Sequence, residues 1–305
     1  MFISPWLLGF LALVVYPFVT SLVWSFCDYD LLSAPKYVGD VHYRRLAAEI
    51  VSGEGFGRAL WNTFYYAALA VPLSIALAVA LAVILSWNVR GKSVYRTLCF
   101  IPSVVPIVAM SILWIWLLDP ADGIVNHALS WLGVSSSNAP KWLADYREAA
   151  WLPAWFRGDG GFGSKDALIL MAMWGVGNFM VIYMAALVDV PDSLHEAAML
   201  DGASRLRRFV SVTLPMLTPV ILFNLVTGMI RSVQAFTQMY LVSEGTGAPQ
   251  QSTLVLSLHM FLAAFQDLNM GYASAMAWIV FVILVAVTWA LLRWSKSWVH
   301  YPESV

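Results

Sequence analysis

Long apolar segments are the feature that most limits how this chain can fold. Six of them are long enough for a membrane-spanning helix, which needs about 20 apolar residues; they cover about 5–26, 59–87, 98–118, 167–188, 215–242 and 271–292. Of all residues 60% are hydrophobic and 11% are charged, whereas soluble domains carry about 25% charged residues. We therefore expect an all-α membrane protein with about six transmembrane helices, forming a single transmembrane domain over residues 1–305.

Several kinds of chemistry lack support in the sequence. The net charge of -1 lacks the basic excess typical of nucleic-acid-binding proteins. The two cysteines do not have the spacing of metal ligands. The tripeptide Gly91-Lys92-Ser93 is only a fragment of a phosphate-binding loop, because Ser86 stands where that motif needs a glycine and no strand precedes it. No nucleophile–base pair is evident. We expect no catalytic residues, no metal site, no cofactor and no ATP bound by this chain.

The segment 189–213 is a polar island between two apolar runs. Ser193 and Glu196 have the spacing of a capping box, which predicts a helix start there, and Gly202 stands where a helix commonly ends. A second short helix is predicted around Arg205, Arg207 and Arg208. The pattern fits a short helical protrusion outside the membrane, but it also fits an amphipathic loop lying on the lipid surface.

The same segment carries a long and specific motif. It reads Glu-Ala-Ala-x-x-Asp-Gly-Ala and, after a spacer, Leu-Pro-x-Leu-x-Pro; the matching residues are Glu196, Ala197, Ala198, Asp201, Gly202, Ala203, Leu214, Pro215, Leu217 and Pro219. This motif resembles the EAA loop of permease subunits of ABC importers. The resemblance implies a type I importer permease fold, with 189–213 as a cytoplasmic coupling loop and Glu196, Ala197, Ala198, Asp201, Gly202 and Ala203 at the contact with an ATPase subunit.

Further phrases support the resemblance. Asp119-Pro120 with Gly123 and Asn126 resembles the family as a whole, and the run from Asp267 through Gly271 to Ala275 is similar to the first permease subunit of its sugar importers. The resemblance implies a subunit of an ATP-driven, binding-protein-dependent sugar importer that works by alternating access. Its implied partners are a second permease subunit, two ATP-binding subunits that hold the ATP, an extracytoplasmic solute-binding protein and membrane lipid.

Basic residues predict how the chain is oriented. They are densest in the short segments 88–97 and 189–213 and after residue 292, at Arg90, Lys92, Arg96, Arg205, Arg207, Arg208, Arg293 and Lys296. Since cytoplasmic loops are enriched in Lys and Arg, we expect both termini and the 189–213 loop in the cytoplasm of a bacterial inner-membrane protein.

The longer loops are then extracytoplasmic. Residues 27–58 are expected to form a polar loop. The loop 119–166 is longer than in the family and includes Trp151, Trp155 and the glycines from Gly158 to Gly163. We interpret this part as a flexible surface loop. Residues 257–265 are apolar but short, which favours an interfacial or re-entrant helix.

Polar side chains in the fifth apolar run are candidates for the substrate path, because polar groups within a span are usually functional. They recur every three or four residues and so should share one helical face: Asn224, Thr227, Arg231, Gln234 and Gln238. Amides and a guanidinium can bind sugar hydroxyls. The alternative is that they form hydrogen bonds between helices.

Three other functions stay open at this point. An ATP-independent secondary transporter usually needs buried acidic residues for ion coupling, and the acidic residues here cluster in loops. A membrane-embedded enzyme would need catalytic groups clustered at one depth. The sequence also leaves open an ABC permease for a non-sugar solute such as a glycerol phosphate.

Overall fold

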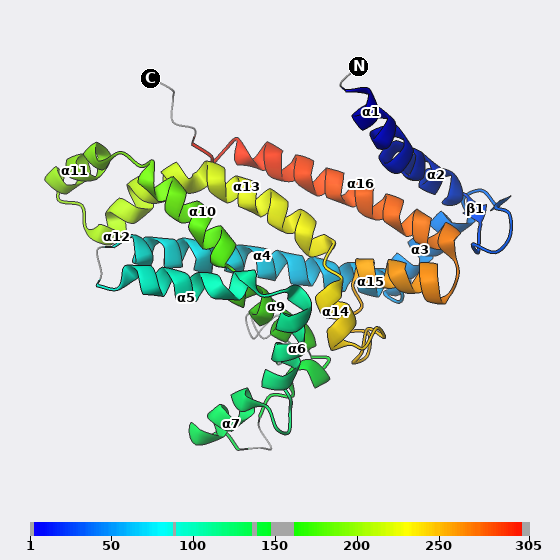
Figure 1. The fold of residues 1–305 in the computed structure, drawn as a ribbon, viewed down its shortest axis with the longest axis horizontal. Coiled ribbons are helices and arrows are strands. Elements are labelled where there is room, and N and C mark those ends of the chain that lie inside the picture. Colours follow the sequence, from blue (N-terminus) through cyan, green and yellow to red (C-terminus); the bar gives the residue numbers. More distant parts are fainter. Residues whose placement is uncertain (1–2, 88–89, 136–138, 148–161, 301–305) are drawn as a thin grey trace. The chain divides into compact units, whose positions relative to one another are not determined.

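The computed structural model describes residues 3–87, 90–135, 139–147 and 162–300, and it is almost entirely helical (Figure 1). Its internal contacts group the chain into two compact units. Unit 1 consists of Met1–Thr63 and Gln234–Ala286, and unit 2 consists of Phe64–Val233 and Val287–Val305. We describe each unit by itself.

Unit 1 combines the N-terminal helices with a later helical segment. Its elements are α1 (Ser4–Phe10), the π-helical turn η1 (Leu11–Val15), α2 (Tyr16–Trp24), β1 (Cys27–Asp28), β2 (Lys36–Tyr37), α3 (Val41–Ser52), α14 (Thr237–Val242), α15 (Leu256–Phe261) and η4 (Leu262–Gln266). The two strands form an antiparallel pair in which Cys27 lies opposite Tyr37. Two long helices, α4 (Phe56–Ser86) and α16 (Met270–Ser295), begin in unit 1 and end in unit 2.

Unit 2 contains the central helices of the chain. They are α5 (Lys92–Val104), α6 (Ile107–Leu117), α7 (Ile124–Trp131), η2 (Trp142–Ala144), α9 (Ser164–Trp174), α10 (Gly177–Val188), α11 (Asp192–Leu200), α12 (Arg205–Arg208), η3 (Phe209–Thr213) and α13 (Leu214–Val233). The buried side chains of α4, α10 and α13 form one core that includes Val71, Tyr183 and Leu217. Gly228 brings α13 close to α4, because a Cβ there would lie 2.9 Å from the Val71 side chain.

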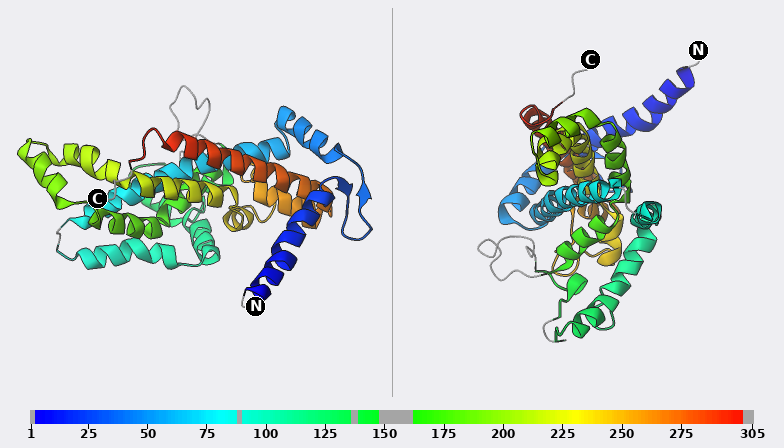
Figure 2. Two further views of the ribbon diagram at one scale, coloured as in Figure 1. Left: turned by 90° about the horizontal axis from the view of Figure 1, so that it is seen from above. Right: turned by 90° about the vertical axis from the view of Figure 1, so that its left-hand side faces the viewer.

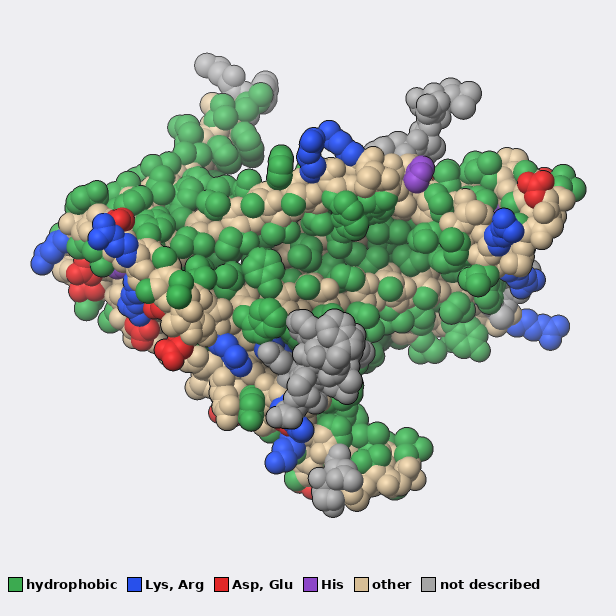
Figure 3. All heavy atoms as spheres, turned by 180° about the vertical axis from the view of Figure 1, so that it is seen from behind, with side chains coloured by type: hydrophobic (Ala, Val, Ile, Leu, Met, Phe, Trp, Pro, Cys, Tyr) green, Lys and Arg blue, Asp and Glu red, His purple; other side chains and the backbone are tan. Residues whose placement is uncertain are grey.

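The helical membrane fold is confirmed. Four helical segments are long and apolar enough to cross a membrane: Ser4–Trp24, Phe56–Ser86, Arg205–Val233 and Met270–Ser295. Two bent helix pairs bring the number to six if each pair is one span. Hydrophobic side chains dominate the face drawn in Figure 3, while charged side chains gather toward its margins.

The third span is not the single helix predicted over 98–118. Helix α5 ends at Val104, and α6 begins at Ile107 after a bend of 100°. Pro106 explains the break, since the residue before a proline avoids the helical region, and Val105 is indeed extended (φ -67°, ψ 129°). The sequence showed the prolines, and the structure shows that the second one redirects the chain.

The fourth span also bends, by 45°, between α9 and α10. Gly177 begins α10 at a close crossing with α5: a Cβ there would lie 2.8 Å from the Cys99 carbonyl oxygen and 2.9 Å from the Phe100 Cα. Small residues allow helix backbones in membranes to approach in this way. Gly177 therefore permits the close packing of α10 against α5.

The segment 27–58 is more ordered than the polar loop that we expected. It contains the strand pair and the twelve residues of α3, whose apolar side buries Leu46. In the 119–166 loop, the structure describes α7 and η2, which Asn126 links by accepting a hydrogen bond from the Trp142 indole at 2.7 Å. Trp151, Trp155 and most of the glycine-rich run lie outside the described residues. Residues 256–266 form the short apolar helix that we expected.

Candidate functional site

The 189–213 loop folds into two short helices, α11 and α12 (Figure 1). The predicted capping box is wrong, because α11 begins at Asp192 rather than after Ser193, and Pro191 stands at the cap without a side-chain hydrogen bond. Ser193 is thus already inside the first turn. Proline favours this boundary because its fixed φ suits a helix start, and the acidic Asp192 complements the positive end of the helix dipole.

Gly202 ends α11 as the sequence predicts. Its φ is +76°, a left-handed conformation that glycine adopts without steric cost. The Ala203 N–H donates to the Ala198 carbonyl at 2.9 Å, and the Gly202 N–H donates to the Met199 carbonyl at 3.0 Å. These two bonds form a Schellman motif, which satisfies carbonyls that a helix end otherwise leaves unpaired.

The motif residues are presented to the outside. Helix α11 has no buried residue, and Glu196, Ala197, Asp201 and Gly202 are all exposed. Leu200 has 90% of its surface exposed. In Figures 1 and 2, α11 projects beyond the ends of α4, α5 and α10 of the same unit. The arrangement offers a small, partly apolar helical surface for a partner to contact.

The second short helix connects this surface directly to a span. Ser204 caps α12 by accepting a weak hydrogen bond from the Arg207 N–H at 3.4 Å. The chain then stays helical through η3 into α13, so that Arg205–Val233 is one apolar helical segment. Helix α11 is therefore joined by a short turn to one end of a continuous helix that runs into the core of unit 2.

The five candidate residues of the substrate path do not share one helical face. Helix α13 ends at Val233, and α14 begins only at Thr237, so the periodic stripe is interrupted. Asn224, Thr227 and Arg231 lie on α13 in unit 2, whereas Gln234 and Gln238 belong to unit 1. Arg231 and Gln234 are exposed, but Asn224 and Gln238 are buried.

Asn224 is the most deeply buried of these residues, with 1% of its surface exposed. It lies beside the Tyr183 hydroxyl of α10, yet neither side chain makes a hydrogen bond of ordinary geometry within the described part of the chain. A buried amide without such a bond is costly.

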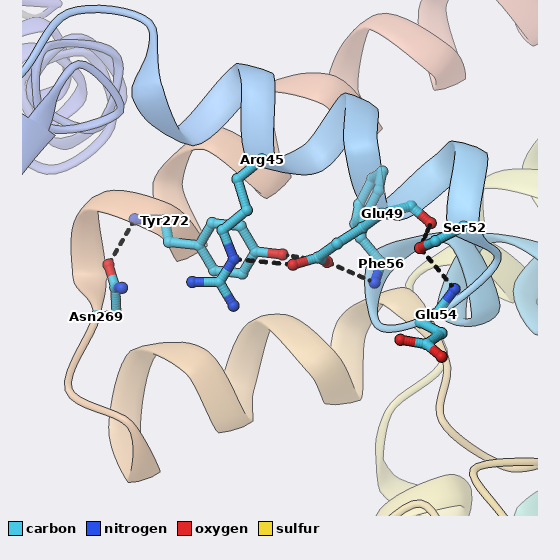
Figure 4. A network of polar contacts seen from close by, with 7 residues as sticks. All are labelled: Arg45, Glu49, Ser52, Glu54, Phe56, Asn269 and Tyr272. Atoms are coloured by element: carbon cyan, nitrogen blue, oxygen red, sulfur yellow. Dashed lines mark hydrogen bonds and ion pairs between the residues drawn. The ribbon is translucent and has the colours of Figure 1, made fainter.

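A polar cluster in unit 1 was not anticipated from the sequence (Figure 4). Glu49 of α3 accepts hydrogen bonds from Arg45 Nε at 2.8 Å, from the Tyr272 hydroxyl at 2.6 Å and from the Phe56 N–H at 2.9 Å. The Arg45 guanidinium also lies over the Tyr272 ring, 4.2 Å from its centroid. One carboxylate thus ties α3 to the first turns of α4 and α16. The Glu49–Arg45 spacing of four was the only local signal.

These contacts also set the pKa of Glu49. Partial burial by itself raises the pKa of Glu49, but the hydrogen bonds from Tyr272, Phe56 and Arg45 outweigh it and hold the pKa below its ordinary value. The carboxylate is therefore charged at neutral pH. Its position suits a structural clamp, because every oxygen is already engaged by the protein.

A second unanticipated cluster lies at the start of α9. Lys165 and Asp166 are buried, with Asp166 accepting a hydrogen bond from the Tyr65 hydroxyl at 2.6 Å. The sequence predicted that the span begins at residue 167, which puts both ionisable residues in the preceding loop.

Within the described ranges, no three His, Cys, Asp or Glu side chains are grouped so that they could hold a metal ion.

The chain matches a protein family and is similar to several known proteins. Residues 70–300 match the family model of the binding-protein-dependent transport system inner membrane component. The probable ABC transporter permease protein YesP of Bacillus subtilis is 38% identical over 303 residues, covering 99% of this chain and 91% of YesP. The lactose transport system permease protein LacF of Rhizobium radiobacter is 33% identical over 290 residues, covering 94% of this chain and 90% of LacF.

The fold agrees with these relatives. A chain in the crystal structure of a bacterial alginate ABC transporter, solved in complex with an alginate pentasaccharide-bound periplasmic protein, superposes with a TM-score of 0.75 at 21% identity, covering 97% of this chain and 93% of that chain. Fold, motif and relatives agree, and the chain therefore belongs to the family of binding-protein-dependent transport system inner membrane components: it is a membrane-spanning ABC importer permease and not an enzyme.

Proposed function

We propose that this permease imports a sugar or a related polyol, and that the 189–213 loop receives the force of ATP hydrolysis from a partner. The observation that carries the proposal is the exposed helix α11, which has no buried residue and whose chain runs through α12 into the span Arg205–Val233. The lactose permease LacF, at 33% identity, supports a sugar as the solute. The alternative is a non-sugar solute carried by the same machinery.

The assembly that we propose has three further subunits, and a binding protein joins them in the functional cycle. A second permease completes the path, and two ATP-binding subunits hold the ATP, since this chain carries no complete nucleotide motif. The family description, with its dependence on a binding protein, supports an extracytoplasmic solute-binding partner. Both termini and the 189–213 loop lie in the cytoplasm in this proposal, where Glu196, Ala197, Ala198, Asp201, Gly202 and Ala203 contact an ATP-binding subunit.

The proposed cycle is alternating access. ATP binding closes the two ATP-binding subunits, α11 moves with them, and the helices turn the path from inward- to outward-facing. The shift requires that ATP binds the two states with different affinity. Along the path we assign Asn224, Thr227, Arg231, Gln234 and Gln238 to contact with the solute or with the water around it.

Cysteine accessibility tests the orientation and the contact together. In a background where Cys27 and Cys99 are serine, Leu200→Cys and Leu32→Cys place thiols at positions with 90% and 83% of their surface exposed. A membrane-impermeant maleimide applied to intact spheroplasts should label position 32 and not position 200. Position 200 should instead cross-link to an ATP-binding subunit in the assembled complex.

Labelling of position 200 from outside, or cross-links from position 32 to the ATP-binding subunit, would refute the coupling role. The solute is tested separately in proteoliposomes that contain the complex. Binding protein loaded with mono- or oligosaccharides should stimulate ATP hydrolysis, and stimulation by non-sugar solutes alone would overturn the sugar assignment.

A further inference from the structure

Unit 2 contains a large groove that none of the five residues assigned to the transport path lines. It has a volume of about 1560 Å³, whereas pockets for small molecules usually measure about 300–1,000 Å³. Its long walls are apolar side chains of α4 and α13, such as Ile75, Val79 and Leu225. All its lining residues belong to unit 2. A groove of this size and polarity suits long hydrocarbon chains better than a compact polar solute.

One part of the groove wall is polar and predominantly basic. Arg205 and Arg208 of α12 line it together with His195 and one acidic residue, Asp192. The Nε of Arg208 is buried and has no hydrogen-bond partner among the described residues. Buried N–H groups of charged side chains are expensive to leave unpaired. Arg205 and Arg208 also form no ion pair with a carboxylate among the described residues, so an anion in the groove would supply a counter-charge.

Three tryptophans mark the same part of the groove. Trp87 follows the end of α4, Trp294 lies in the last turn of α16, and Trp298 follows it. The Trp298 indole N–H is also buried without a hydrogen-bond partner in the part of the chain that is described. Tryptophan concentrates where lipid headgroups meet hydrocarbon. The basic part of the groove thus lies at headgroup level, and its apolar walls extend from there into hydrocarbon.

We propose that this groove binds an anionic phospholipid. Its phosphodiester accepts hydrogen bonds from the guanidinium groups of Arg205 and Arg208, and its acyl chains lie along α4 and α13. Basic pockets between transmembrane helices recognise anionic headgroups in this way, and a guanidinium binds phosphate oxygens with two parallel N–H bonds. A zwitterionic lipid is disfavoured, because its ammonium group would face the two arginines.

Lipid retention tests the proposal on the chain purified with its co-expressed partner subunits. The complex is reconstituted in nanodiscs of mixed phosphatidylglycerol and phosphatidylcholine and then transferred to detergent, and the lipid that stays bound is measured by mass spectrometry. Arg205→Gln with Arg208→Gln should lower the retained phosphatidylglycerol roughly tenfold, the effect of losing charged hydrogen bonds. Trp298→Phe should lower it less, and retained phosphatidylcholine should not change.

Arg207→Gln is the matched control, because Arg207 lies on the same helix but does not line the groove. It should leave phosphatidylglycerol retention at the wild-type level. Equal losses in Arg207→Gln and in the double variant, or equal retention of both lipids by the wild-type complex, would overturn the proposal. Size-exclusion chromatography of each variant confirms that the complex remains assembled.

Photo-crosslinking identifies the occupant directly. A benzophenone attached to Ala80→Cys, on the groove wall, should yield an adduct with phosphatidylglycerol. An adduct with a polypeptide would show that a partner subunit fills the groove and would refute lipid binding. The readouts do not depend on transport, so a failure here is distinguishable from a failure of the proposed sugar import.

Discussion

Helices α3 and α11 are both short and polar, both lie outside the spans, and both end at a glycine in the left-handed conformation. They differ in what holds them. Helix α3 buries His42 and Leu46 and is tied to two long helices through Glu49, whereas α11 buries no residue. The difference shows that an anchored polar helix supports the fold, while an unanchored one leaves its side chains free for a partner.

The largest effect should come from breaking the anchorage of unit 1. A Cβ at Gly271 would lie 2.0 Å from the Cys27 carbonyl oxygen and 2.9 Å from His42 Nε2. Backbone must move to make room, which costs about 1–3 kcal/mol or more, so Gly271→Val should lower the amount of folded protein in the membrane several-fold. Quantitative immunoblotting of membranes checks this, with Gly9→Ala as the control, since nothing lies within 4 Å of a Cβ there. An unchanged amount would mean that α3 is not anchored as described.

The two terminal glycines provide a matched test of the comparison. Gly202 after α11 and Gly53 after α3 have φ values of +76° and +72°, and a Cβ at either one would meet open space. Leucine should strain both positions equally, by about 1–2 kcal/mol. We expect Gly202→Leu to abolish solute uptake with the protein still present, and Gly53→Leu to retain most uptake. Similar uptake in the two variants would remove the functional distinction between α3 and α11.

The clamp at Glu49 should make the stability of unit 1 depend on pH. Its pKa is lowered from the ordinary value of 4.5, so its stabilisation is present above that value and is lost as pH falls through the folded-state pKa. Glu49→Gln should lower the thermal midpoint at pH 7, and the gap to wild type should narrow as the pH approaches the lowered pKa. Glu54→Gln, whose side chain is exposed, should behave like wild type. A gap of the same size at all pH values would show that the charge of Glu49 is not what stabilises unit 1.

The smallest effects are expected on α13, which carries both an exposed and a buried polar side chain. Arg231 is exposed, and Asn224 is buried. Arg231→Ala should change the KM or the solute preference of uptake several-fold without changing the amount of protein. Asn224→Ala should lower stability as well, because it leaves a cavity beside Tyr183. Unchanged uptake kinetics would make Arg231 a structural residue.

Much of the fold was accessible from local pattern. Apolar segment length predicts the spans, because a backbone in lipid must satisfy its own hydrogen bonds within a helix. The glycine at 202 predicts the end of α11, because its left-handed cap needs no distant contact. Side-chain capping at Ser193 failed, since Pro191 takes the cap position and the helix starts two residues earlier than the capping pattern requires.

The amino-acid sequence alone determined where the apolar segments lie, the class of protein and the place of the EAA-like motif, because these depend on composition and on neighbours along the chain. Only the tertiary structure decided that Pro106 turns the chain by 100°, that the polar stripe breaks after Val233 and that Glu49 meets Tyr272. Such features depend on contacts between residues far apart in sequence, or on how sharply a local break bends the chain. A periodic sequence pattern specifies neither the distant contacts nor the angle of the bend.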